Sequence, residues 1–474
     1  MDILRFCVVF LKRGIPAAAW SFRHDVQTHS PSSPGPGVVL APFRGVRYDP
    51  VRVSGLADVT SPPYDVIGPG ALDALLAASP YNVVRLILPA IELDAHAAGA
   101  VAAGRLGSWL SSGVLAPDPE PALYVYEQRG PGFTQRGLIG LVGVGTDGIL
   151  PHEGVMPSLV TGRRELMMAT RANLEPILLV YNGGESGADS LDALDGPGAG
   201  TGGHGGPAGP ASRLVDFAAD ERPPLVSAVT SDGITHRLWR LTDPAEHATI
   251  AADLAGRTAL IADGHHRYAA YRELRSLMDE AGPWDYGLAF LVDADAYPPR
   301  LGAIHRVIPH LAPQDAARLA AAAFTVEKLA DVPPDDVPAA VGLLADAGRD
   351  GTAFLLVGRS GCWLLTRPDQ EQLAAAMPAE ASPRWRALDA SVMQELLLAQ
   401  LWLIKDNERD VLISHDAGEA IRMALDADGT AVICNPMPLA AVKDVAAHGE
   451  RVPRKSTSFG PKPRTGLVLR TFEP

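Results

Sequence analysis

The residues best suited to chemistry stand together at positions 263–267, which read Asp-Gly-His-His-Arg. The apolar run 259–262 predicts a strand before them, and an apolar stripe at Tyr268, Tyr271 and Leu274 predicts a helix after them. A strand that turns at a glycine into a helix leaves the first amide N–H groups unpaired, and the helix dipole favours an anion there. The pattern therefore predicts an anion site, and its residues are Asp263, Gly264, His265, His266 and Arg267. The alternative is an ordinary helix that the aspartate caps.

A second polar cluster begins at His152 and Glu153 and continues into the basic stretch 161–176. The pair is not a zinc-protease motif, because no second histidine follows at the spacing that puts two imidazoles on one helix face. A carboxylate beside a histidine at the end of a strand can act as a general base. Glu153 and His152 are therefore candidate catalytic residues, and Arg171 is a candidate contact to the substrate. The alternative is a salt-bridge network beside a helix.

The third cluster lies in the tail, where residues 451–466 are basic in an otherwise acidic chain. Hydroxyl groups interleaved with fixed cations suit phosphate oxygens. The candidate residues are Lys455, Ser456, Thr457 and Lys462. A solvated basic loop is the alternative.

Near the start of the globular sequence, two prolines at positions 62 and 63 fix the backbone and leave Tyr64 and Asp65 on a rigid loop. Polar residues held on rigid loops often contact ligands. We therefore expect Tyr64 and Asp65 to contact the substrate.

Composition excludes several classes of protein. A formal net charge of −14 argues against general nucleic-acid binding, which needs basic surfaces. The apolar run 6–11 is too short for a membrane span, so no membrane partner is expected. The three cysteines lie far apart, which favours a reducing, cytoplasmic setting over a disulfide framework. The oligomeric state cannot be predicted.

Strands and helices alternate along most of the chain, but hairpins interrupt them, which predicts an α/β fold with a mixed sheet. The expected hairpins pair 122–127 with 134–144 and 224–230 with 235–241, and residues 83–88 are expected to form a strand. We divide the chain into an N-terminal extension (1–37), a main α/β domain (38–310), a small α/β subdomain (311–385) and a C-terminal segment (386–474) that returns to the main domain. The glycine-rich tract at 183–210 lacks the flanks of a phosphate loop and is expected to be a flexible insertion.

Five segments together resemble a bacterial and archaeal family catalogued as domain of unknown function 1015. They are Ala41–Arg47, Pro62–Ile67, His152–Glu153, Ile261–Arg267 and Lys455–Lys462, in the expected order. The strand–helix turn at 263–267 is also similar to the phosphate-binding turn of the ParB–sulfiredoxin superfamily, which includes free-serine kinases. This second resemblance implies that residues 264–267 hold the phosphates of ATP, ADP or another nucleotide, that Asp263 helps to bind Mg²⁺, and that Glu153 takes the proton of the acceptor hydroxyl.

The resulting hypothesis is a nucleotide-dependent phosphotransferase that acts on a small hydroxyl metabolite such as serine. Two alternatives remain. The first is a metal-dependent phosphatase that binds its ion through His152, His265 and His266, although adjacent helical histidines point about 100° apart. The second is a nucleotide-responsive binding module without turnover. Fold analogy does not decide among them.

Overall fold

The computed structural model describes residues 37–89, 94–184, 208–329, 337–407 and 409–473. The expected N-terminal extension up to residue 36, and most of the glycine-rich tract, lie outside these ranges. No helix in the described ranges is long and apolar enough to cross a membrane.

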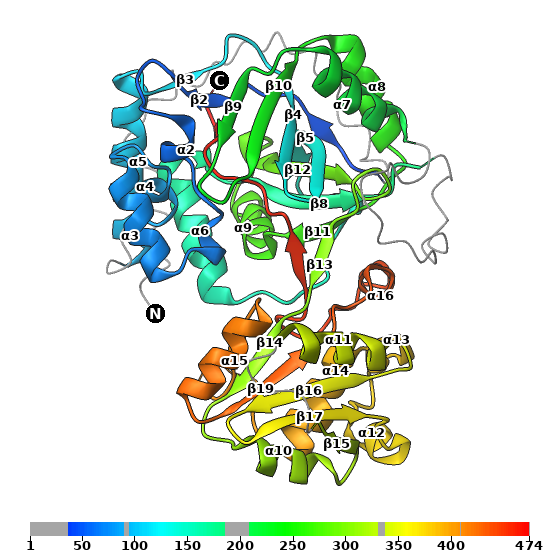
Figure 1. The fold of residues 1–474 in the computed structure, drawn as a ribbon. Coiled ribbons are helices and arrows are strands. Elements are labelled where there is room, and N and C mark those ends of the chain that lie inside the picture. Colours follow the sequence, from blue (N-terminus) through cyan, green and yellow to red (C-terminus); the bar gives the residue numbers. More distant parts are fainter. Residues whose placement is uncertain (1–36, 90–93, 185–207, 330–336, 408, 474) are drawn as a thin grey trace. The chain divides into compact units, whose positions relative to one another are not determined.

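Residues between 40 and 293 form a large mixed sheet (Figure 1). Its order is β6-β11-β8-β12-β5-β4-β10-β9, and β1 also pairs with β5. The strands are β1 (Leu40–Ala41), β4 (Leu123–Gly130), β5 (Phe133–Gly143), β6 (Ile149–Leu150), β8 (Ile177–Tyr181), β9 (Val226–Val229), β10 (Thr235–Leu241), β11 (Ala259–Asp263) and β12 (Tyr286–Asp293). The pairs β11–β6 and β12–β8 are parallel and the others antiparallel, so the predicted mixed α/β sheet is confirmed.

Both faces of this sheet are buried, because strand side chains alternate between two separate cores. On β4, Leu123 and Val125 enter the core beneath α7 (Pro210–Glu221), α8 (Pro244–Leu254) and α9 (His265–Ser276), whereas Tyr124 and Tyr126 enter the core that includes α16 (Leu439–Ala447). The predicted hairpins β4–β5 and β9–β10 are both present.

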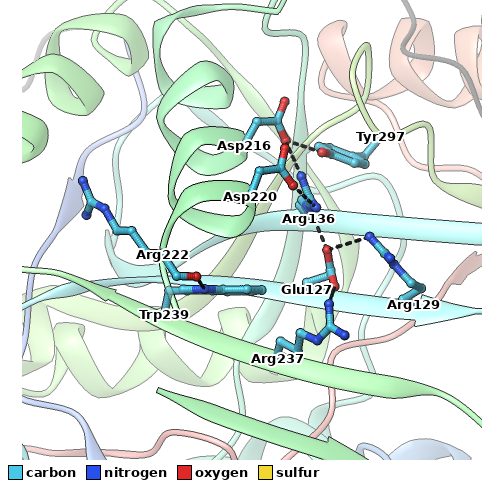
Figure 2. Close-up of polar contacts among 9 residues, drawn as sticks. All are labelled: Glu127, Arg129, Arg136, Asp216, Asp220, Arg222, Arg237, Trp239 and Tyr297. Carbon is cyan, nitrogen blue, oxygen red and sulfur yellow. Dashed lines mark hydrogen bonds and ion pairs between the residues drawn. The ribbon is translucent and has the colours of Figure 1, made fainter. Parts of the chain in front are cut away.

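A buried ion-pair network ties α7 to the sheet (Figure 2). Glu127 on β4 is fully buried and accepts a hydrogen bond from Arg136 Nε at 2.7 Å. Arg136 also donates to Asp216 at 3.2 Å and to Asp220 at 2.7 Å, both on α7. Arg237 on β10 lies 3.3 Å from Glu127. Because each buried charge has partners, this network is structural, and it fixes the helix against the strands.

A second, antiparallel sheet follows, in the order β15-β17-β16-β19-β14-β18. Its strands are β14 (His305–Ile308), β15 (Thr325–Lys328), β16 (Ala353–Gly358), β17 (Gly361–Thr366), β18 (Leu412–Ser414) and β19 (Thr430–Cys434). Helices α10 (Pro313–Ala320), α11 (Val337–Gly348), α12 (Gln370–Ala376) and α15 (Ala417–Asp426) flank it, together with α14 (Asp389–Ser391) and the π-helix η4 (Val392–Leu401). Strands β18 and β19 come from beyond residue 386, so the C-terminal segment contributes to this sheet.

The remaining helices include α2 (Leu56–Val59), α3 (Pro69–Ala78), α4 (Val84–Ile87), α5 (Ala95–Ser111), α6 (Pro157–Thr170) and α13 (Pro383–Arg386). Three two-stranded pairs link distant segments: β2 (Val46–Tyr48) with β3 (Leu115–Pro117), β13 (Arg300–Gly302) with β20 (Ser458–Gly460), and β21 (Arg470–Thr471) with β7 (Ala172–Asn173). Short 3-10 turns occur at η2 (Tyr64–Val66) and η3 (Pro283–Asp285). The expected strand at 83–88 is wrong, because α4 occupies this segment.

Candidate functional site

The predicted strand–glycine–helix turn is confirmed at Gly264, between β11 and α9. Gly264 has φ +93°, a left-handed conformation that L side chains rarely adopt, and a Cβ there would lie 2.8 Å from Ile177 Cγ2. The N-cap residue is therefore glycine, and the alternative in which Asp263 caps the helix is wrong. No side chain of the described residues caps α9, and the residues of its first turn, His265, His266 and Arg267, line the pocket defined below. A helix start without a side-chain cap leaves amide N–H groups without intrahelical partners, and such positions favour anions.

A row of alternating charges crosses this turn. The Lys462 Nζ atom lies 2.7 Å from Asp65 Oδ2 and 2.6 Å from Asp263 Oδ1. The other oxygen of Asp263 accepts from Arg267 Nη2 at 2.7 Å, and Arg267 Nη1 donates to the carbonyl of Pro176 at 2.6 Å. Lys462 therefore joins the tail to both the rigid loop at Asp65 and the end of β11.

Burial and pairing compete in setting the protonation of this row. Burial alone would raise the pKa of Asp65, but the charge and hydrogen bond of Lys462, together with the charges of Arg267 and Lys455, outweigh it and lower that pKa to about 2. Burial and the neighbouring Asp65 charge raise the pKa of Asp263. Burial opposes the charge of Arg267, yet the carboxylates of Glu175 and Asp263 hold its pKa above the ordinary arginine value.

Glu153 reaches the same place from the loop after β6. Its Oε1 accepts the backbone N–H of Lys455 at 2.6 Å, and residues 153 and 452 form a parallel bridge. Burial raises the pKa of Glu153, although the hydrogen bond and charge of Lys455 oppose that shift. Lys455 has φ +55°, and within the described parts of the chain no hydrogen bond or ion pair holds its ammonium group. The site thus contains a carboxyl group of raised pKa beside an unpaired cation.

The three histidines of the sequence prediction all make hydrogen bonds within the fold, two through their rings to backbone N–H groups and one to a hydroxyl group. His265 Nε2 accepts the N–H of His152 at 3.3 Å, and His266 Nε2 accepts the N–H of Met156 at 3.0 Å. Burial lowers the pKa of His152 to about 3 and also lowers those of His265 and His266. His152 Nε2 lies 2.9 Å from the Thr457 hydroxyl, and its ring packs edge-on against His265. The histidines therefore fasten the 152–156 loop and the tail onto α9.

Most of the predicted residues line one small pocket that encloses about 50 Å³. Those brought together are Tyr64, Asp65, Glu153, Asp263, Gly264, His265, His266, Arg267, Lys455, Thr457 and Lys462. Tyr64 donates its backbone N–H to Glu175 at 3.0 Å, and the guanidinium of Arg163 lies 4.1 Å from the centre of its ring. Three clusters that are far apart in the sequence therefore share a pocket.

Three predicted residues lie elsewhere. His152 is fully buried behind the pocket wall, where its ring contacts Thr457, His265 and Phe459, which line the pocket. Ser456 does not line the pocket either, and its hydroxyl donates to the carbonyl of Pro453 at 2.6 Å. Arg171 ends α6 in a left-handed conformation, and its side chain lies 3.4 Å from Glu473. The structure therefore does not bring Arg171 to the pocket that the other predicted residues line.

Five lining residues were not among the predicted site residues: Ala262, Ile304, His415, Ser458 and Phe459. His415 follows β18, and its Nδ1 lies 3.0 Å from the Ser458 hydroxyl. Ser458 lies within the basic tail that the sequence marks as a possible anion site, so that pattern could have identified it. No sequence pattern marks His415, because only the pairing of β18 in the second sheet brings it to the tail.

The carboxylates and histidines do not form a metal centre in this arrangement. Among the residues that the structure describes, no group of three or more His, Cys, Asp or Glu side chains is arranged to hold an ion. Both oxygens of Asp263 are paired with cationic side chains, and the Nε2 atoms of His265 and His266 already accept backbone hydrogen bonds. The cation position between Asp65 and Asp263 is filled by Lys462 itself.

The fold and this site define an α/β protein with a densely charged pocket at a strand–helix turn. The chain belongs to the family described as "Protein of unknown function (DUF1015)", whose model matches residues 40–196 and 205–391, and the predicted membership is thereby confirmed. A search of curated proteins found no match.

Solved structures show distant similarity. A mutant free serine kinase in complex with ADP is 14% identical with a TM-score of 0.31, and the alignment covers 66% of this chain and 84% of that one. SbnI with a C-terminal truncation from Staphylococcus aureus is 12% identical with a TM-score of 0.34, covering 70% and 87%. A conserved hypothetical protein from Pyrococcus furiosus is 13% identical with a TM-score of 0.32, covering 69% and 93%.

Proposed function

We propose that this protein is a nucleotide-dependent phosphotransferase that acts on a small hydroxyl metabolite, in the manner of a serine kinase. One observation carries the proposal: the carboxyl group of Glu153 borders the same pocket as Arg267, Lys455 and Lys462 and the start of α9. Phosphoryl transfer needs mainly charge neutralisation, in-line positioning and a base for the attacking hydroxyl. This pocket supplies a group for each requirement.

The phosphates of the nucleotide would bind at the start of α9 and at Lys455, whose ammonium has no partner within the described ranges. Arg267 contributes charge from behind the turn. Its Nε is the guanidinium nitrogen that has no hydrogen-bond partner among the described residues, and it lies close to Gly264. A pocket of about 50 Å³ fits phosphate groups and excludes a whole nucleotide.

Glu153 would act as the general base, and its raised pKa suits a group that accepts a proton near neutral pH. The acceptor oxygen forms a new bond to the terminal phosphorus while its proton moves to a Glu153 oxygen. The bond from that phosphorus to the bridging oxygen of the nucleotide breaks, and the shortened nucleotide leaves with the electron pair. Tyr64 and Asp65 also line the pocket and are the groups proposed to contact the acceptor.

Asp263 has a different role in this proposal from the Mg²⁺ ligand that the sequence resemblance implied. Both of its oxygens are held by Lys462 and Arg267, so a metal ion would have to displace one of them. In this proposal Asp263 positions these two cationic side chains and does not bind a metal ion. Nucleotides in solution carry bound Mg²⁺, and in this proposal the ion enters with the phosphates of the donor nucleotide.

The test is a donor and acceptor screen. The full chain is incubated with free serine, Mg²⁺ and ATP, ADP or CTP, and phosphoserine is measured by mass spectrometry. We expect phosphoserine with at least one donor and none when serine or the nucleotide is left out. Nucleotide binding without any product, across a panel of small hydroxyl compounds, would instead establish a binding module.

The phosphatase alternative is tested in the same preparation. Phosphoserine alone is incubated with the dialysed protein, and metal content is measured by elemental analysis. We expect no release of phosphate and less than one tightly held transition-metal ion per chain. One zinc or iron ion per chain together with hydrolysis would overturn the proposed reaction.

A further inference from the structure

A larger cavity borders the candidate site. It encloses about 520 Å³, and its walls come from β16, α14, η4, the end of β19 and α16. Ile304 lines both this cavity and the site pocket. Ser456 lines the cavity, whereas its two neighbours Lys455 and Thr457 line the pocket. One turn of the tail therefore presents alternate side chains to two adjoining spaces.

The walls of this cavity are mainly apolar. Phe354, Leu388, Met393 and Met437 supply broad surfaces of the kind that pack against flat rings. Its volume falls in the range typical of small-molecule sites, about 300–1,000 Å³. The cavity is accordingly far roomier than the neighbouring pocket, which encloses about 50 Å³.

The polar groups on these walls mostly accept hydrogen bonds. Asn435 uses its Nδ2 to donate to the carbonyl of Leu344 at 3.1 Å, which leaves its carbonyl oxygen for a ligand. Asp389 adds a partly buried carboxyl group. The one cationic lining residue, Arg384, is paired with Glu450 and lies 3.3 Å from Asp444. The described lining thus favours a neutral ligand that carries N–H or O–H donors, and it offers no unpaired cation to a phosphate or carboxylate.

We propose that this cavity binds the nucleoside part of the nucleotide, base and ribose together, while the phosphates lie in the adjoining pocket. This inference rests on the proposed function. A base supplies a flat apolar ring with N–H groups, and a ribose supplies hydroxyl donors, which match these walls. A small amino acid such as serine is a poor fit, because its carboxylate would find no unpaired cation there. The division also explains how a pocket too small for a nucleotide takes part in its binding.

The experiment compares two ligands on two matched variants by isothermal titration calorimetry. Ala441 lines the cavity on α16, whereas the adjacent Ala440 is exposed and does not line it. For Ala441→Phe we expect ADP affinity to fall at least about tenfold, with inorganic pyrophosphate affinity within about twofold of the wild type. Ala440→Phe should change neither affinity. Unchanged ADP affinity in a folded Ala441→Phe protein overturns the proposal.

A second variant keeps the test decisive if the phenylalanine disturbs folding. Asp389→Asn preserves size but removes the carboxylate, and we expect it to weaken ADP about threefold or more without weakening pyrophosphate. Lys455→Ala should weaken both ligands, which separates the two hypotheses. If Lys455→Ala weakens both and the cavity variants weaken neither, the anion site stands and the nucleoside assignment is wrong. If the wild type binds neither ligand, both fail.

Discussion

Lys462 provides the sharpest test of how the site is assembled, because its ammonium bridges Asp65 and Asp263 at 2.7 and 2.6 Å. Replacing it by methionine keeps most of the apolar stem and removes the charge. The two carboxylates then face each other with only Arg267 left to Asp263. We therefore expect Lys462→Met to destabilise the fold and to weaken anion binding.

The loss of stability can be worked from the pairing. The pKa of Asp65 lies at about 2 rather than near its ordinary 3.8, and a shift of this size corresponds to about 2 kcal/mol. The side chain of Asp65 is 26% exposed, so solvent screening reduces this contribution to about 1–2 kcal/mol. Leaving one buried oxygen of Asp263 without its partner adds about 1–3 kcal/mol. The expected total is about 2–5 kcal/mol at pH 7.

The pH dependence has a defined sign. In the wild type, the Asp65 contribution is complete above its unfolded pKa and is lost as the pH falls through about 2. In Lys462→Met, burial and mutual repulsion raise the pKa of both carboxylates. They therefore take up protons at a higher pH than in the wild type, and protonation removes the repulsion between them. The deficit in unfolding free energy should therefore shrink between pH 7 and about pH 4.

The assay is urea-induced unfolding at pH 7 and pH 4, followed by two spectroscopic probes to check that the transitions coincide. Lys405→Met serves as the control, because Lys405 is exposed and makes no side-chain ion pair within the described ranges. A deficit below about 0.5 kcal/mol, or one that is equal at both pH values, would refute the bridging role of Lys462.

Three further predictions concern single positions. Gly264→Ala should cost about 2–4 kcal/mol of unfolding free energy, because φ is +93° and Ile177 lies 2.8 Å from the added Cβ, whereas Gly256→Ala, with open space around it, should stay within about 1 kcal/mol of the wild type. Activity should fall as Glu153 is protonated, with a midpoint above the ordinary glutamate value, and Lys455→Met should move that midpoint to higher pH because Lys455 lowers the pKa of Glu153; an unmoved midpoint in the pH–rate profile contradicts this assignment. Arg171→Ala should leave the KM for both substrates within about twofold of the wild type, since Arg171 lies outside the pocket and pairs with Glu473. A clear rise in KM would show that Arg171 contacts a substrate.

Local patterns predicted those parts of the fold in which propensity and packing agree. The strand–glycine–helix turn at Gly264 and the two hairpins of the large sheet were readable because their apolar spacing matches the structure. The segment 83–88 was misread, because a short apolar run fits a buried helix equally well. There the side chain of Asn82 accepts the N–H of Val84, the first residue of α4, at 2.9 Å, and the helix packs into a buried core.

The sequence indicated which segments form the site, but not which side chains of those segments line the pocket. Glu153 and Lys455 belong to polar clusters visible in the sequence, but which neighbour faces the pocket depends on backbone orientation. The structure places His152 and Ser456 outside the pocket lining: His152 is fully buried, and the Ser456 hydroxyl donates to the carbonyl of Pro453. His415 was missed because only tertiary pairing brings it to Ser458.

The most direct measurement is the effect of Glu153→Gln on binding and turnover in the same protein. The substitution keeps the side chain's size and an oxygen to accept the Lys455 N–H, but it removes the proton acceptor. We predict a nucleotide Kd within about twofold of the wild type and a phosphoserine formation rate lower by about 100-fold or more. A variant that binds nucleotide normally and still forms phosphoserine at the wild-type rate would contradict the role of Glu153 and the mechanism built on it.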